Sequence, residues 1–138
     1  MQFQQIFKAA KLPLWLRPYE ILATGPGCGI LECVPDAMSI DSVKKTSRMP
    51  TLVEFFNHTY GRTKSRIFKR ARKAFVESLA GYSLFCYLLQ VKDRHNGNIL
   101  LDSHGHLIHI DFGFLISNSP GGGFNFEQAP FKLTADDI

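Results

Sequence analysis

The sequence predicts an α+β fold in which helices separate two short β-hairpins. Turn-forming residues at 24–29 and at 102–105 each lie between two short apolar runs, which is the pattern of an antiparallel hairpin. Between the hairpins, apolar residues recur at intervals of three and four, as they do on the buried side of a helix. A length of 138 residues and a hydrophobic fraction of 45% indicate one ordinary folded unit and exclude a disordered chain.

The first part of the chain predicts a helix followed by a hairpin. Residues 2–10 have apolar side chains on one side at helical spacing, and Pro13 ends the pattern. The runs 19–23 and 30–34 predict the two strands. The turn at 24–29 contains three glycines, but it lacks both G-x-G-x-x-G spacing and a following Gly-Lys-Ser/Thr. We therefore interpret it as a turn and not as a phosphate-binding loop.

The middle of the chain predicts three helices. Residues 39–45 indicate a short one. Thr51, with a glutamate three residues later, is a capping box that begins a second helix, and Gly61 ends it. Residues 64–91 have a long helical pattern, in which Gly81 weakens the prediction of a single continuous helix.

The last part of the chain predicts a second hairpin and a long loop. Residues 99–101 and 107–110 are the expected strands, and residues 102–105 are the turn between them. Residues 112–134 have no sustained period and contain several glycines and prolines, so they predict a loop. Loops of this length in a compact domain are usually functional.

Three features predict a cytoplasmic protein. The three cysteines are too few and too scattered for a disulfide framework, so we expect reduced thiols. The start of the sequence has no charged and then apolar leader, so we do not expect secretion. The most apolar stretch, residues 74–91, includes Glu77 and Gln90, and it predicts a buried helix rather than a membrane span.

Basic residues are concentrated in one segment. The formal net charge is +4, and residues 62–73 include seven basic residues and no acid. We interpret the segment first as a solvated helix face, second as a surface that contacts an anionic membrane, and third as a nucleic-acid site. No aromatic stacking platform is interleaved with these charges, so we expect no nucleic acid as a partner. The residues are Arg62, Lys64, Arg66, Lys69, Arg70, Arg72 and Lys73.

Polar residues around the second hairpin have the spacing of a phosphoryl-transfer site. Such a site needs metal ions that bridge the phosphates and a polar group that positions the attacking hydroxyl. Asp93 and Asn98 have four residues between them, as in the kinase pattern H-R-D-x-x-x-x-N, and Asp111 begins an Asp-Phe-Gly after the hairpin. A hairpin returns its two ends to one place, so Asn98 and Asp111 can both face one Mg²⁺ through hard oxygen ligands. Ordinary turn residues are the alternative, but three at this spacing favour the site.

Histidines in and beside this cluster allow more than one interpretation. The triplet is Asp-Arg-His and not His-Arg-Asp, which puts His95 close to Asn98. Its imidazole could accept the substrate proton or donate to the γ-phosphate, and the sequence does not decide between these roles. His104, His106 and His109 could bind zinc, but strand alternation places the third on the opposite side from the other two. We therefore expect no zinc site.

Two segments resemble one family. Residues 91–102 and 109–114 hold the Asp-Arg-His-Asn-Gly-Asn string and the Asp-Phe-Gly, and they resemble the phosphatidylinositol 3-/4-kinase family. The resemblance extends over nearly the whole chain. It implies part of a two-lobed, protein-kinase-like lipid kinase fold. Residues 1–34 would be the end of the small lobe with the hinge, and residues 35–138 the first part of the large lobe with the catalytic and activation loops.

The resemblance also implies cofactors and site residues. ATP would be bound with Mg²⁺, or alternatively with Mn²⁺. The catalytic residues would be Asp93, Arg94 and His95, and the metal ligands Asn98 and Asp111. The nucleotide would contact the hinge, an aromatic ring and an apolar floor, formed by Tyr19, Glu32, Cys33, Val34, Leu100 and Ile110.

The expected reaction is transfer of the ATP γ-phosphate to the 4-hydroxyl of phosphatidylinositol. Residues 112–131, which match the activation loop, contain no Lys or Arg. A loop that binds phosphates on an inositol ring would need such cations, so we expect an unphosphorylated head group. The choice of the 4-hydroxyl over the 3-hydroxyl rests on the resemblance alone. The resemblance further implies a peripheral location on intracellular membranes, Golgi or endosomal.

The resemblance leaves two alternatives to an active kinase. Family members have a phosphate-covering loop and a phosphate-binding lysine before the segment that this chain matches, so we expect the chain alone to have little or no activity. The first alternative is a non-catalytic fragment or pseudokinase that binds a membrane or a protein partner. The second is a protein kinase or a related giant kinase with the same metal ligands, which the basic-free loop disfavours.

Overall fold

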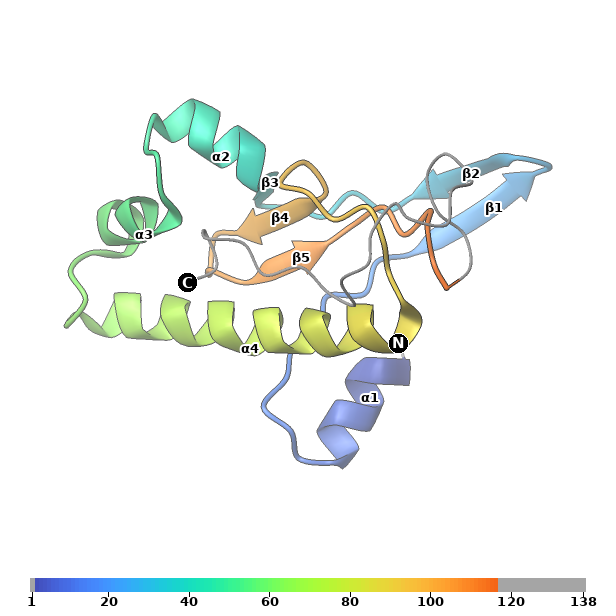
Figure 1. Ribbon diagram of the computed structural model, residues 1–138, viewed down its shortest axis with the longest axis horizontal. Helices are drawn as coiled ribbons and strands as arrows, with labels where there is room; N and C mark the ends of the chain where they lie inside the picture. The colour runs from blue at the N-terminus through green and yellow to red at the C-terminus, as the bar shows by residue number, and fades with distance from the viewer. Residues whose placement is uncertain (1, 117–138) are drawn as a thin grey trace.

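The structure is a computed structural model, and it describes residues 2–116 (Figure 1). Every helix and strand predicted within this range is present, which confirms the mixture of α and β structure. The predicted loop at 112–134 lies outside the described residues after position 116. In chain order the elements are α1 (Gln2–Ala9), β1 (Ile21–Gly25), β2 (Cys28–Leu31), β3 (Ala37–Ser39), α2 (Ile40–Ser47), α3 (Leu52–Tyr60), α4 (Arg66–Leu89), β4 (Ile99–Asp102) and β5 (Leu107–His109).

The strands form two antiparallel sheets. β1 pairs with β2, with Ile21 opposite Leu31, as the first predicted hairpin requires. β4 pairs with β5 on one side and with β3 on the other. β3, in which Ala37 lies opposite Asp102, is not among the predicted strands. β3 is only three residues long, which is too short for an alternation of apolar and polar residues to reveal it.

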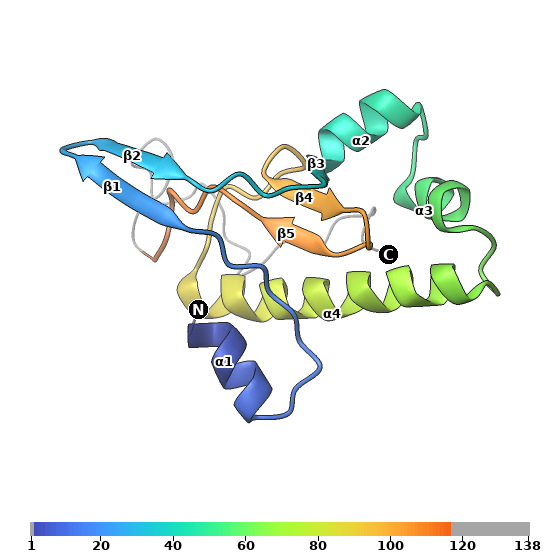
Figure 2. The same ribbon diagram turned by 180° about the vertical axis from the view of Figure 1, so that it is seen from behind.

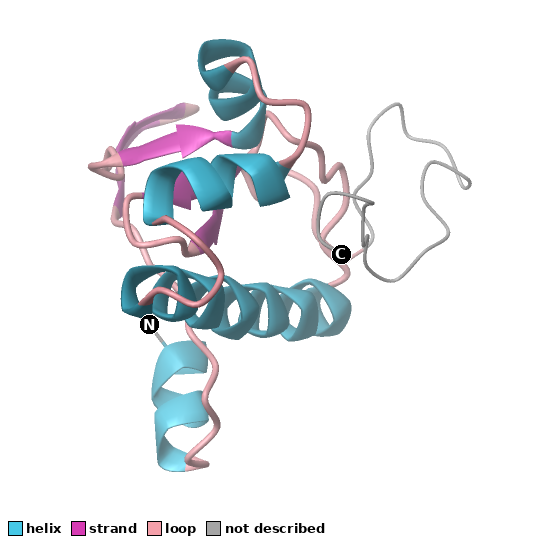
Figure 3. Cartoon of the chain, turned by 90° about the vertical axis from the view of Figure 1, so that its left-hand side faces the viewer, coloured by secondary structure: helices cyan, strands magenta, loops and turns pink. Residues whose placement is uncertain are grey.

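α4 is a single helix of 24 residues that packs along one side of the three-stranded sheet (Figures 1 and 3). Helix and sheet are also joined by a polar contact. The hydroxyl of the fully buried Ser78 accepts a hydrogen bond of 2.8 Å from the backbone N–H of Leu107. The core between α2, α3, α4 and the sheet consists of Ile40, Leu52, Phe56, Tyr60, Phe68, Ala71, Leu101 and Leu107.

Gly81 does not interrupt α4. A glycine is needed at this position because the chain between α1 and β1 packs against the helix there. Figure 2 shows this connecting segment crossing the helix. A Cβ atom at position 81 would lie 2.6 Å from the backbone oxygen of Trp15. The Trp15 N–H in turn donates to the carbonyl oxygen of Glu77 at 3.1 Å. The missing side chain at 81 therefore lets two backbones approach closely.

The β1–β2 hairpin projects from the rest of the described chain (Figure 1). Every residue of both strands is exposed, including four large apolar ones that are 62–64% exposed. An isolated two-stranded hairpin has little stability in water. None of the helices within residues 2–116 is both long and apolar enough to cross a membrane. The four apolar residues are Ile21, Leu22, Ile30 and Leu31.

Candidate active site

The loop between α4 and β4 positions the first of the predicted polar residues. α4 ends at Gln90, whose backbone is left-handed and whose N–H donates to the last helix carbonyls. Asp93 is also left-handed, with φ of 61°. Asp tolerates this conformation better than most residues do. Two such residues within four positions reverse the chain at the end of the helix and lead it into β4.

The side chain of Asn98 holds this loop together from inside. It is only 4% exposed. Its Oδ1 accepts a hydrogen bond of 3.0 Å from the His95 N–H, and its Nδ2 donates to the carbonyl oxygen of Asp93 at 2.6 Å. This one amide therefore links two backbone groups of the loop between α4 and β4. Its oxygen has a second lone pair that these bonds do not use.

His95 is exposed, and its ring is oriented by its own loop. The Gly97 N–H donates to His95 Nδ1 at 3.1 Å. A ring nitrogen that accepts a hydrogen bond has no proton, so the neutral imidazole has its proton on Nε2. The geometry therefore presents Nε2 as a hydrogen-bond donor. The sequence left the donor and acceptor roles open.

The second hairpin brings Asp111 back to Asn98. The Ile110 N–H donates to the backbone oxygen of Asn98 at 3.0 Å, next to the pairing of Ile99 with His109. Asp111 follows directly, with an exposed side chain and φ of 57°. The two predicted metal ligands thus lie at the same end of the hairpin, as the spacing indicates. That their side chains share one metal ion stays a prediction.

Arg94 connects the loop between α4 and β4 to the Asp-Phe-Gly segment. It is 6% exposed, and its guanidinium donates to the backbone oxygens of Ile110, at 2.8 Å, and of Asp111. Its Cζ also lies 5.4 Å from the centre of the Phe112 ring, within the range of a cation–π contact. Burial lowers the pKa of Arg94 from its usual value. Its contacts are those of a group that fixes the backbone around Asp111.

Tyr19 lies against the same segment, so the N-terminal part of the chain contributes to the site. Its ring is parallel to that of Phe112, at 14° and 6.4 Å between centres. Burial raises the pKa of the Tyr19 hydroxyl, although a hydrogen bond with the Asp111 backbone opposes the shift. Phe112 thus contacts both Tyr19 and Arg94. These two contacts of Phe112 were not predicted from the sequence, where it is only the middle residue of Asp-Phe-Gly.

Of the other residues predicted to contact the nucleotide, Glu32 is bonded to the segment that includes Tyr19. The carboxylate of Glu32 accepts hydrogen bonds from the Glu20 N–H, at 2.8 Å, and from Arg17, at 2.9 Å. These bonds hold the pKa of Glu32 below its usual range. Glu20 directly follows Tyr19, so Glu32, the residue after β2, is joined to the same short segment. Cys33 is exposed, whereas the partly buried residues are Val34, Leu100 and Ile110.

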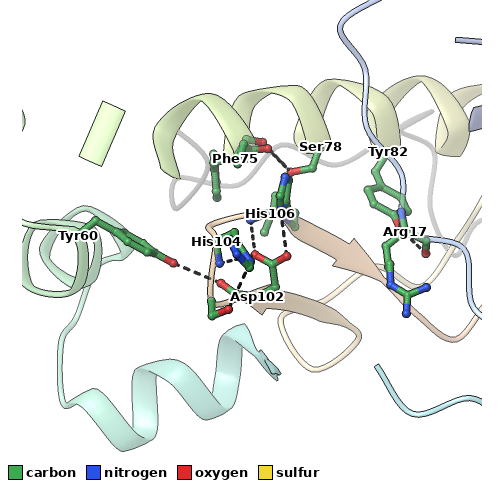
Figure 4. Close-up of polar contacts among 11 residues, drawn as sticks. Arg17, Tyr60, Phe75, Ser78, Tyr82, Asp102, His104 and His106 are labelled. Carbon is green, nitrogen blue, oxygen red and sulfur yellow. Dashed lines mark hydrogen bonds and ion pairs between the residues drawn. The ribbon is translucent and has the colours of Figure 1, made fainter. Parts of the chain in front are cut away.

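The two histidines of the turn between β4 and β5 form hydrogen bonds with a carboxylate at the end of β4 (Figure 4). The carboxylate of Asp102 accepts hydrogen bonds from the backbone N–H groups of His104 and His106, and from His106 Nδ1 at 2.9 Å. Burial alone would raise the pKa of Asp102, but these bonds outweigh it and the pKa is lowered. The His106 ring stacks on Trp15 at 4.0 Å. Within residues 2–116, no group of three His, Cys, Asp or Glu side chains could hold a metal ion.

His109 is the last residue of β5, and it is 8% exposed. Its ring stacks on Tyr82 at 4.5 Å, and its Nδ1 lies 3.6 Å from the sulfur of Cys86. Burial, with a smaller effect of the Arg94 charge, lowers the pKa of His109 to about 3. His109 is therefore neutral in the folded protein at physiological pH.

Because the unfolded pKa of His109 is near 6.5, the unfolded chain takes up a proton that the folded chain does not. Stability should fall as the pH decreases below about 6.5, and the loss should level off near about pH 3. Between about pH 7.5 and about pH 5.5 we expect this residue to cost about 1.4 kcal/mol of unfolding free energy. Urea denaturation at the two pH values measures the difference. His109→Phe should remove it, and the exposed control His58→Gln should not; an unchanged pH dependence in the first variant would contradict the buried neutral state.

The sequence of the chain matches a known family over its whole length. The model of the family described as Phosphatidylinositol 3- and 4-kinase matches residues 1–138. The chain therefore belongs to this family.

Three relatives show how similar the chain is to named proteins. It is 59% identical over 137 residues to phosphatidylinositol 4-kinase beta 1 of Arabidopsis thaliana, covering 97% of this chain and 12% of the relative. It is 53% identical to phosphatidylinositol 4-kinase of Dictyostelium discoideum, covering 98% of this chain and 11% of the relative. It is 50% identical to phosphatidylinositol 4-kinase beta of Xenopus tropicalis, covering 99% and 17%. The chain thus spans less than a fifth of the length of these relatives.

Proposed function

We propose that the chain is the part of a lipid kinase that holds its catalytic loop, and that the whole protein phosphorylates the 4-hydroxyl of phosphatidylinositol with ATP. The observation that supports this most is the hydrogen bond between Ile110 and Asn98, which puts Asp111 beside the catalytic loop. The family and the names of the relatives support the lipid substrate. In this proposal residues 1–34 end the small lobe of a two-lobed domain, and residues 35–138 begin its large lobe.

The oxygens available at the site fit a magnesium ion. Asn98 Oδ1 has a free lone pair beside the one that the His95 N–H occupies. The exposed Asp111 carboxylate accepts a long contact of 3.4 Å, from the Gly113 N–H to Oδ1. One amide and one carboxylate oxygen are hard ligands of the kind that Mg²⁺ takes alongside phosphates and water, and Mn²⁺ accepts the same ligands. When bound, the metal would offset the charge of the ATP phosphates.

The remaining polar residues of the loop have separate roles in this proposal. Asp93 accepts the hydrogen bond of the attacking inositol hydroxyl and orients it. His95 donates from Nε2 toward the developing negative charge, since its Nδ1 is occupied by Gly97. Arg94 positions the backbone at Asp111 and does not itself contact the substrates. Positioning and electrostatic stabilisation of this kind account for most of the catalysis in phosphoryl transfer.

In this proposal, different parts of the protein bind the two substrates. We propose that the adenine ring lies against Tyr19 and the backbone of residues 32–34, over the apolar side chains of Leu100 and Ile110. Phosphatidylinositol is presented by a membrane surface on which the protein is peripheral. The basic-free composition of residues 112–131 supports an unphosphorylated head group. Residues 117–131 lie outside the described part of the structure.

The function is tested by the product that the full-length protein makes from radiolabelled ATP. Thin-layer separation should show phosphorylation of phosphatidylinositol, and little or none of its bis-phosphate. Asp111→Ala should lower the rate by about a thousandfold or more, because the metal loses its carboxylate ligand. We expect no measurable activity from the 138-residue chain alone, since it spans only 11–17% of its relatives. A preference for the bis-phosphate, or full activity of Asp111→Ala, would refute the assignment.

A further inference from the structure

One half of α4 presents a basic surface that the proposed catalysis does not use. All seven basic residues between positions 62 and 73 are exposed. Within α4 they alternate with the buried residues Phe68, Ala71 and Ala74, so they lie on the side of the helix away from the core. Lys73 forms an ion pair with Glu77, at 3.6 Å, and remains 74% exposed. The basic residues are Arg62, Lys64, Arg66, Lys69, Arg70, Arg72 and Lys73.

This surface borders an apolar hollow between α4 and the segment that follows α1. The hollow has a volume of about 440 Å³. Val76, which is 56% exposed, and Ala80 form its wall on the helix, and Pro13 and Leu14 form the opposite wall. A hollow of this size takes one or two apolar side chains. The cations on its edge are Lys69, Arg72 and Lys73, and the acid is Glu77.

The position of the hollow argues against a flat membrane as its occupant. α1 projects from the side of α4 opposite the sheet, close to the segment that forms one wall (Figures 1 and 2). A bilayer that approached α4 from this side would meet α1 first. The basic residues also lie at the start of a helix of 24 residues, about 36 Å long, whose other end leads into the catalytic loop. A membrane at the basic end is therefore not placed to present lipid to Asp93.

A nucleic acid fits the hollow less well than a peptide does. Bases are held in single strands by stacking on exposed aromatic rings. The aromatic residues in this half of α4 are Phe68 and Phe75, and both pack into the core. A narrow peptide can place acidic groups over the cations and one apolar side chain between the walls, which satisfies both features of the surface.

We propose that this surface, formed by Lys69, Arg72, Lys73 and the hollow beside Val76, binds an acidic peptide segment of a partner protein with one apolar anchor residue. The charges attract and orient the segment, and the hollow buries the anchor. Such an interaction is separate from the chemistry of the active site. The proposed peptide binding does not depend on the proposed kinase function, and the two are tested by different measurements.

The test is fluorescence anisotropy of the full-length protein with a labelled peptide of Asp and Glu residues around a single Leu. The variant Lys69→Glu with Arg72→Glu should weaken binding by about tenfold or more, since it reverses two contacting charges. The matched control, Lys45→Glu with Arg48→Glu, makes the same charge change at the exposed end of α2 and should change affinity by less than about twofold. Lipid phosphorylation should be unchanged in both variants.

A second pair of measurements tests the hollow itself. Val76→Ser should weaken binding of the Leu peptide but not of a peptide with Ser in place of Leu, because only the first buries an anchor. Equal binding by wild type and Lys69→Glu/Arg72→Glu would overturn the proposal. So would binding to phosphatidylserine vesicles that depends on the same two residues while the acidic peptide does not compete, since the surface would then be a membrane contact.

Discussion

Asn98→Ala should reduce lipid phosphorylation by the full-length protein by about a thousandfold. The substitution removes the proposed metal ligand, and it also removes both hydrogen bonds that hold the catalytic loop. The N–H of His95 and the carbonyl oxygen of Asp93 would lose their partners. A hydrogen bond of this kind contributes about 0.5–1.5 kcal/mol net. The loss of activity should therefore be accompanied by a loosened loop.

Asn98→Asp separates these two contributions. Its carboxylate keeps an oxygen for the metal and for the His95 N–H, but it cannot donate to the Asp93 carbonyl, which Nδ2 contacts at 2.6 Å. We expect its rate to fall by about a hundredfold, with a loop still loosened at Asp93.

Steady-state rates and amide hydrogen exchange of residues 93–98 measure both effects. Asn57→Ala is the matched control, because Asn57 is exposed and also makes one side-chain bond to a backbone oxygen. It should change neither the rate nor the exchange. If Asn98→Ala retained the wild-type rate, neither the metal role nor the loop role of this amide could be correct.

The secondary structure of this chain was predictable where the local signals are strong. Thr51 accepts the hydrogen bond from the Glu54 N–H that a capping box requires, and the two Gly-containing turns form hairpins. β3 was missed because three residues give no period and its pairing with β4 is a long-range contact. Gly81 suggested a break in α4 because helix propensity is local, whereas the reason for a glycine there is the approach of Trp15 from far along the chain.

The polar residues of the site were predictable from spacing, but their contacts were not. Spacing along the chain indicated that Asn98 and Asp111 lie near each other, since a hairpin joins them. It could not indicate that the Asn98 amide turns inward to hold the loop, or that Arg94 donates to the backbone on both sides of Asp111. The contact of Tyr19 with Phe112 joins residues more than ninety positions apart, which no local pattern encodes.

Gly81→Val should destabilise the protein by about 3 kcal/mol or more. The new Cβ would be placed 2.6 Å from the backbone oxygen of Trp15 and 3.2 Å from its nitrogen. Backbone atoms cannot rotate away as the end of a side chain can, so the segment must separate from α4. That movement would also break the hydrogen bond from Trp15 to Glu77 and withdraw the ring of Trp15 from His106.

The effect of Gly81→Val should extend to the active site, because the displaced segment continues into Tyr19. The Tyr82 hydroxyl donates to the carbonyl oxygen of Arg17, and this contact keeps the segment close to the helix. Calorimetric unfolding measures the loss of stability, and the Michaelis constant for ATP reports the displacement of Tyr19. Ala80→Val is the matched control, since residue 80 is exposed and should cost less than about 1 kcal/mol. Equal stability of the two variants would show that the segment is not held against α4 as closely as its contacts indicate.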